Sequence, residues 1–112
     1  MRKLEIIIRH SRLRAVKEGL LALGVRGMSI TDIKGFGRQG GHTEIYRGNE
    51  IQVDFVPKVK LEIVMKAELV DKAVDVIREH ACTGQVGDGK IFILPVENVI
   101  RIRTDERGVC AM

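Results

Sequence analysis

Hydrophobic and polar residues alternate along residues 3–9, where Leu4, Ile6 and Ile8 share one face. Alternation in a run rich in β-branched residues predicts a strand with an apolar face in the core. The apolar positions that follow have helical spacing and predict a helix. These positions are Leu13, Val16, Leu20 and Leu23.

Local signals mark the ends of this helix. Ser11 is a residue type that can cap it, and Gly24 stands where a helix end needs positive φ. A second strand is expected over Met28–Phe36. The first half of the chain therefore predicts a βαβ unit.

The pattern then repeats, because residues 60–65 mirror residues 3–8. A second helix is expected over residues 68–81, with its buried positions at Leu69, Ala73, Ile77 and Ala81. After it we expect a Gly-rich turn over 82–90, a strand over 91–94 that ends at Pro95, and a short strand over 98–103.

Two βαβ units predict an α+β fold, a ferredoxin-like βαββαβ sandwich in one domain of residues 1–112. A long Gly-rich segment, 37–56, separates strands 2 and 3, and a segment of this length inside a small domain favours a functional loop. The sheet face without helices still carries Ile7 and Val64, which predicts a homo-oligomer.

Composition narrows the function classes. The 112 residues are 45% hydrophobic and 30% charged, with a net charge of +4, as in a globular protein. With no signal-peptide pattern or spanning run, we expect a cytoplasmic protein that does not insert into membranes. The two cysteines favour free thiols, and the three histidines lack metal-ligand spacing. Four aromatic residues argue against a nucleic-acid binder.

Two glycine motifs resemble nucleotide-binding signatures. Residues 35–40 spell G-x-G-x-x-G, but no helical pattern follows, so the dinucleotide reading is rejected. Residues 84–90 spell G-x-x-x-x-G-K, but Ile91 follows instead of Ser or Thr, which rejects a P-loop NTPase. Gly87 and Gly89 still allow an anion-binding nest beside Lys90, and the alternative is a tight turn with a solvated lysine.

Arg101 and Arg103 lie two residues apart in the expected last strand. We expect both on one face, with Ile100 and Ile102 toward the core. Such a pair suits phosphate oxygens. The alternative is neutralisation by nearby acidic side chains, namely Glu97, Asp105 and Glu106.

Five segments together resemble the PII signal-transduction proteins of nitrogen metabolism. They are residues 34–39, 42–48, 53–58, 83–92 and 99–104. The resemblance covers essentially the whole chain. It implies a compact homotrimer that binds ATP or ADP in the clefts between subunits, acts as a regulator and is not an enzyme.

The resemblance also assigns residues to that cleft. The implied nucleotide-binding residues are Ser29, Gly35, Gly37, Arg38, Glu62, Val64, Gly87, Asp88, Gly89, Lys90, Arg101 and Arg103. The implied 2-oxoglutarate-binding residues are Gln39, Gly40, Gly41, Lys58 and Gly87. Gln39 would also bind the Mg²⁺ that is shared with ATP and 2-oxoglutarate.

The long loop would contact the regulated partner, an Amt-family ammonium channel or a soluble nitrogen-metabolism protein. Its implied contact residues are Glu44, Tyr46, Arg47, Gly48, Asn49, Glu50 and Ile51. A channel partner would recruit the protein to the membrane. Residues 104–112 are expected to be a flexible end.

The chain departs from the family at the loop. Ile51 stands where many relatives carry a modified Tyr, and Asn49 where others carry a phosphorylated Ser, so we expect neither modification there. Gly40 replaces a common Lys.

Two other function classes fit the sequence less well. A ferredoxin-like RNA-binding module needs aromatics on its central strands, and residues 3–9 and 60–66 have none. An acylphosphatase-type enzyme needs an Asn that orients water, and neither Asn49 nor Asn98 is suitably placed.

Overall fold

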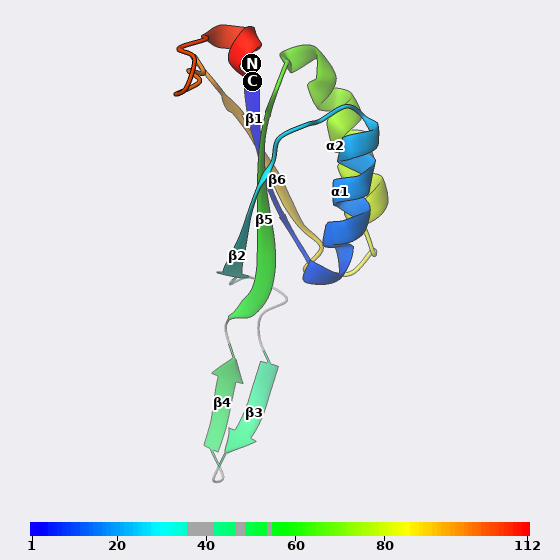
Figure 1. The fold of residues 1–112 in the computed structure, drawn as a ribbon. Helices are drawn as coiled ribbons and strands as arrows, with labels where there is room; N and C mark the ends of the chain where they lie inside the picture. The colour runs from blue at the N-terminus through cyan, green and yellow to red at the C-terminus, as the bar shows by residue number, and fades with distance from the viewer. Residues whose placement is uncertain (36–41, 47–48, 54) are drawn as a thin grey trace.

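The computed structural model describes residues 1–35, 42–46, 49–53 and 55–112, and within 42–53 it describes the backbone alone. Four strands form one antiparallel sheet in the order β2 (Ser29–Gly35), β5 (Val56–Met65), β1 (Arg2–Ile8), β6 (Gly89–Pro95). Helices α1 (Leu13–Ala22) and α2 (Val70–Ala81) cover one face of this sheet (Figure 1). The predicted ferredoxin-like sandwich is confirmed.

The core lies between the sheet and the two helices. Leu4, Ile6 and Ile8 of β1 are buried there, as their alternation predicts. β5 contributes the residues opposite them, and each helix contributes one apolar stripe. Those further core residues are Val59, Leu61, Ile63 and Met65 of β5, Val16 and Leu20 of α1, and Val70, Ala73, Ile77 and Ala81 of α2.

Each helix starts later than predicted. Ser11 makes no capping bond, because residues His10–Arg12 form a separate 3₁₀ turn (η1) before α1. Ala67–Leu69 form a similar turn (η2) before α2, which leaves Leu69 only half-buried. Gly24 does take the predicted positive φ, +102°, after α1. Gly19 is the point of close approach between the helices, since a Cβ there would lie 2.7 Å from the side chains of Val76 and His80.

The long segment between β2 and β5 contains regular structure. β3 (His42–Tyr46) and β4 (Asn49–Val53) form an antiparallel hairpin, with His42 opposite Val53 and Tyr46 opposite Asn49. In Figure 1 this hairpin projects from the end of the sheet where β2 stops and β5 starts. The loop is therefore partly a β-ribbon, which the alternation of Ile45, Ile51 and Val53 with polar residues could have indicated.

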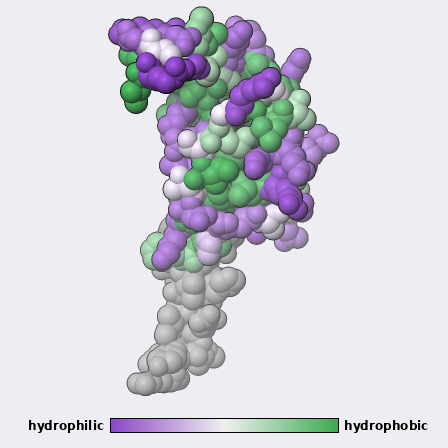
Figure 2. Space-filling model, viewed as in Figure 1, coloured by the Kyte–Doolittle hydropathy of each residue, from purple (hydrophilic) through white to green (hydrophobic). Residues whose placement is uncertain are grey.

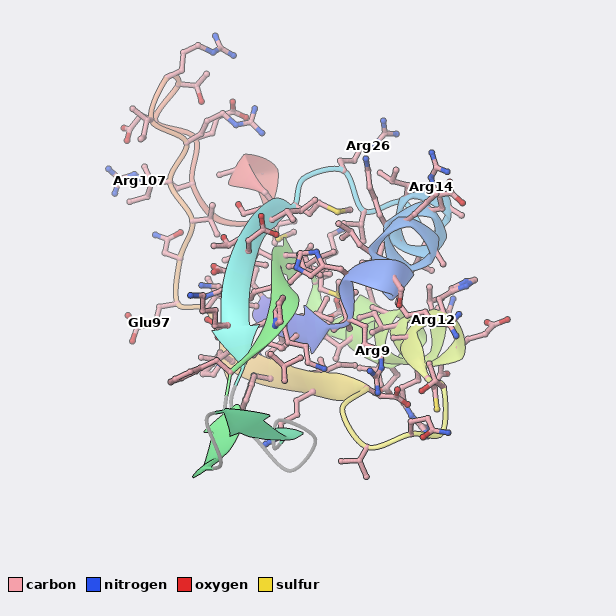
Figure 3. The ribbon with its side chains drawn as sticks, turned by 90° about the horizontal axis from the view of Figure 1, so that it is seen from below. Arg9, Arg12, Arg14, Arg26, Glu97 and Arg107 are labelled. Carbon is pink, nitrogen blue, oxygen red and sulfur yellow. The ribbon has the colours of Figure 1, made fainter. Side chains whose placement is uncertain are left out.

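The expected strand over 98–103 is wrong. After Pro95 the chain leaves the sheet as an arm, residues 96–107, held by an isolated bridge between Ile100 and Arg107 (Figure 3). Ile100 is 50% exposed and Ile102 is 100% exposed, so neither reaches the core. The arm folds back on itself at Asp105, whose φ is +61°.

The C-terminal segment then returns to the domain. Gly108–Ala111 form a 3₁₀ turn (η3), and Ala111 is buried. The flexibility expected for residues 104–112 stays a prediction. No helix in the described ranges is long and apolar enough to cross a membrane.

Candidate functional site

The turn between α2 and β6 is organised around the carboxylate of Asp88. This carboxylate accepts hydrogen bonds from the backbone N–H of Thr83 at 2.7 Å and of Gly84 at 3.0 Å, and from the Thr83 hydroxyl. The Nε atom of Arg9 donates a fourth bond at 3.2 Å. The bonds from Thr83 and Arg9 hold the pKa of Asp88 well below its usual range. The turn therefore carries its own bound anion.

Glycine is required at the start of β6. Gly89 has φ +115°, and a Cβ there would lie 1.7 Å from the Ile7 carbonyl oxygen. Gly87 also has positive φ, +104°, as the predicted nest requires. A strand follows Lys90 instead of a helix, which confirms the rejection of a P-loop.

Two cations hold the middle of this turn. The guanidinium of Arg9 donates to the carbonyl of Val86 at 2.9 Å, and the ammonium of Lys58 donates to the carbonyl of Gly87. Figure 3 shows Arg9 beside the loop that connects α2 and β6. Lys58 is only 3% exposed, and its burial, together with the nearby Arg9, lowers its pKa. Lys58, which the sequence analysis predicts as a site residue, is therefore a buried cation.

Several predicted site residues lie on the sheet face that the helices leave uncovered. The strand register places Ser29 opposite Glu62, Ile33 opposite Lys58, and Lys90 opposite Ile7. Opposite residues share a face, and alternate residues of one strand share it too. The site residues on this face are Ser29, Gly35, Lys58, Glu62, Val64 and Lys90.

Glu62 lies within a charged cluster on that face. Its carboxylate lies 2.8 Å from the Nζ atom of Lys3 and 3.1 Å from that of Lys60. The bond from Lys3, followed by that from Lys60, lowers the pKa of Glu62. Glu62 is thus an ionised acceptor that a hydroxyl-bearing ligand can meet.

Ser29, Glu62 and Val64 line one open groove of about 940 Å³. The loop after α1 forms one wall, and η3 with Met112 forms another. Three of the predicted nucleotide-binding residues are therefore neighbours within a single chain. The turn with Gly87 is held by Lys58, further toward the start of β5.

Arg101, one of the two arginines predicted to bind phosphate, contacts other residues of the C-terminal segment. Arg101 lies 3.4 Å from Glu106 and donates to the Met112 carbonyl at 3.4 Å. Glu106 is thus an ion-pair partner of Arg101 within the chain, and the predicted role of Arg101 at a phosphate stays a prediction. Arg103 is exposed and makes no ion pair with the described part of the chain. The two arginines are not side by side on a strand, because the arm is not part of the sheet.

Other predicted residues lie outside what the structure describes. Gly37, Arg38, Gln39, Gly40 and Gly41 fall in 36–41, and Arg47 and Gly48 fall between β3 and β4. Glu44, Tyr46, Asn49, Glu50 and Ile51 belong to the hairpin, whose backbone alone is described. Among the described residues there is no group of three or more His, Cys, Asp or Glu side chains that could hold a metal ion.

Sequence reasoning missed Arg9 and Thr83. The alternation of residues 3–9 gives Arg9 no partner, because its partner Asp88 is 79 positions away in the chain. No local signal connects the two residues. Thr83 was detectable, because a hydroxyl residue and an aspartate that flank a glycine turn often bond to its backbone.

Comparison with known proteins gives a consistent assignment. The family described as "Nitrogen regulatory protein P-II" matches residues 1–106. A relative of that name from Azospirillum brasilense is 56% identical over 108 residues, 96% of each chain. The "Nitrogen regulatory protein P-II 1" of Escherichia coli (strain K12) is 53% identical over 112 residues, 100% of each chain.

A solved structure agrees with the sequence matches. The crystal structure of Arabidopsis thaliana PII bound to citrate has a TM-score of 0.81 and 43% sequence identity to this chain. The alignment covers 99% of this chain and 91% of that one. This chain therefore belongs to the nitrogen regulatory protein P-II family.

Proposed function

We propose that this chain is a cytoplasmic, non-enzymatic sensor of energy and carbon–nitrogen status. Three copies form a trimer whose subunit clefts bind ATP or ADP and, with Mg-ATP, 2-oxoglutarate. The occupied cleft sets the conformation of the 37–56 loop. That loop then selects the target, an Amt-family ammonium channel or a soluble nitrogen-metabolism protein.

One observation carries this proposal: Lys58 joins the loop to the phosphate turn. The Lys58 side chain crosses Gly35, where a Cβ would lie 3.1 Å from its Cγ atom, and its ammonium reaches the Gly87 carbonyl. Gly35 and Lys58 flank the loop, and Gly87 belongs to the turn. A ligand that draws Lys58 away from Gly87 thus acts on both segments at once.

The trimer is supported by apolar surface that one chain leaves exposed. On the uncovered face of β6, Phe92 is 45% exposed and Leu94 is 38% exposed. β6 is also an edge strand. Figure 2 shows hydrophobic residues at the surface of the body, between hydrophilic patches. Burial against other subunits would remove this surface from water.

The polar groups suit a polyanion with its metal. Lys58, Lys90 and Arg9 supply positive charge at the turn, and in this proposal Glu62 accepts a ribose hydroxyl. Mg²⁺ commonly binds through substrate phosphates and few protein ligands. In this proposal Gln39 is its protein ligand, and Lys58 pairs with a carboxylate of 2-oxoglutarate. The citrate-bound relative from Arabidopsis thaliana also binds a carboxylate anion.

The proposed loop responds to ligands and not to covalent modification at its tip. Ile51 and Asn49 lack the hydroxyl groups that a nucleotidyl or phosphoryl transfer needs. The RNA-binding alternative has no supporting observation, because β1 and β5 carry no aromatic residue for base stacking.

Thermal denaturation with ATP, ADP and AMP, each with and without Mg²⁺ and 2-oxoglutarate, tests the proposal. A ligand at about 100 times its Kd stabilises the folded state by roughly 2.7 kcal/mol. We expect stabilisation by ATP and ADP, and a further shift by 2-oxoglutarate only with Mg-ATP. Unchanged melting curves across the whole matrix would refute the proposal.

Lys58→Met separates the two ligands. The variant keeps most of the apolar stem but loses the ammonium. We expect it to bind ATP and to lose the 2-oxoglutarate shift. Lys72→Met, an exposed substitution on α2, is the matched control and should behave as wild type.

A further inference from the structure

The carboxylate of Asp88 is fully engaged by hydrogen-bond donors of the protein. Its two carboxylate oxygens accept from Thr83, Gly84 and Arg9, four donors in all. The backbone N–H groups of Thr83 and Gly84 are the kind of inward-pointing pair that binds anions in nests. Here they bind a carboxylate of their own chain. Asp88 is therefore saturated by protein donors and does not face a ligand.

The same carboxylate fixes the remainder of the turn. Arg9 binds Asp88 through Nε and the Val86 carbonyl through its terminal nitrogen, so one guanidinium holds two points. Lys58 holds Gly87 between them. Three consecutive residues, 86 to 88, are thus each tied to a side chain from another strand or its end. The glycines at 87 and 89 would otherwise leave this backbone free.

Lys58 and Arg9 differ in the acceptors to which they donate hydrogen bonds. Lys58 donates to a neutral carbonyl, and a ligand carboxylate would be a stronger acceptor for it. Arg9 donates to a carboxylate that three further protein donors also hold. Arg9 and Asp88 thus keep the turn in place when Lys58 leaves it.

We propose that Asp88 is an internal anion that holds the turn in its phosphate-accepting shape, as a positioning residue fixed by Thr83 and Arg9. This inference rests on the proposed nucleotide site and revises the role of Asp88 there, from a ligand contact to the group that shapes the site. A turn that is already ordered loses no conformational freedom when a ligand binds. The resulting gain in affinity is limited to ligands whose phosphates contact the turn.

The test is calorimetric titration of Asp88→Asn with ATP, ADP and adenosine, alongside wild type. The amide has the same size but lacks the charge and cannot accept all four bonds. We expect affinity for ATP to fall by about tenfold or more, the scale of one charge-assisted hydrogen bond. Adenosine affinity should stay within about twofold, because adenosine has no phosphate to meet the turn and the groove lined by Ser29, Glu62 and Val64 lies outside it.

Four further variants complete the experiment. Asp75→Asn, on the exposed face of α2, removes the same charge elsewhere and should bind ATP as wild type does. Thr83→Val removes the hydroxyl and should lose ATP affinity, whereas Thr83→Ser keeps it and should not. Asp88→Ala should regain ATP affinity when formate, a small carboxylate, replaces chloride at equal ionic strength.

The outcomes are distinguishable. A wild-type chain that binds neither ATP nor ADP overturns the proposed function and this inference together. A wild type that binds ATP beside an Asp88→Asn variant of equal affinity overturns this inference alone. If Asp88→Asn does not fold, equal ATP affinity of Thr83→Val and Thr83→Ser overturns it instead.

Discussion

Gly89→Ala should be among the most damaging single changes in this chain. Two independent requirements meet at this glycine. Its φ of +115° is one that side chains rarely adopt, and a Cβ would lie 1.7 Å from the Ile7 carbonyl oxygen. That oxygen belongs to the backbone of the central strand β1, so no side-chain rotation relieves the contact.

The magnitude can be built from these two requirements. Backbone strain at such a φ costs about 1–3 kcal/mol. The contact must open from 1.7 Å to at least 3.0 Å, a shift of 1.3 Å (3.0 − 1.7) between paired strands. Forced displacement in a packed interior costs a further 1–3 kcal/mol, roughly. The sum is about 2–6 kcal/mol, a large share of the 5–15 kcal/mol typical of a domain, roughly.

Urea unfolding followed by circular dichroism, at one protein concentration, measures this loss. Two glycines provide matched controls. Gly24 has φ +102° but open space around it, so Gly24→Ala should lose only the strain, about 1–3 kcal/mol. Gly27 has ordinary φ and open space, so Gly27→Ala should stay within about 1 kcal/mol of wild type. The reasoning is refuted if Gly89→Ala unfolds at the same urea concentration as Gly24→Ala.

Three further predictions follow from other contacts. Gly19→Ala should destabilise the helix pair by about 1 kcal/mol or more, despite better helix propensity, because the new methyl meets Val76; thermal denaturation checks this. Asp88 has a lowered pKa, so its stabilising effect is complete above the usual aspartate pKa and is lost as pH falls below about 4; Asp88→Asn should flatten that acid-side loss of unfolding free energy. Leu94→Glu should shift the proposed trimer toward monomer in sedimentation without unfolding the chain, since the new carboxylate stands opposite Lys3 within the chain.

The fold was predictable because its signals are local and repeated. Leu4, Ile6 and Ile8 alternate, and the same pattern recurs at Leu61 and Ile63, which face the same core. Two βαβ units have few ways to share one sheet. The arm was not predictable in this way. Ile100 and Ile102 alternate with arginines as a strand would, but the arm turns back at Asp105 and Ile100 pairs with Arg107 of the same arm.

The candidate site was predictable only where the residue type itself indicates a role. The glycines of the turn were predicted from the sequence motif, whereas Lys58 was predicted only through the family resemblance. The Arg9–Asp88 pair was not, since proximity across 79 positions follows from the pairing of β1 with β6 and not from spacing. Antiparallel pairing brings Gly89 opposite Ile8, and this places the turn beside the residue that follows β1.

The position of β5 explains why ligand binding at this site would change the conformation of the 37–56 loop. Lys58 and Glu62 lie on one face of β5, four residues and thus about 13 Å apart along the strand. β5 is hydrogen-bonded to β2 on one side and to β1 on the other, so its middle is fixed. Its first residues, by contrast, follow directly on the loop. In the proposed function a nucleotide that contacts Glu62 and the turn is anchored by the rigid part of β5. Any displacement of Lys58 must then be taken up at the start of the strand, where the loop ends, because β1 pairs with β5 only from Val59 onward.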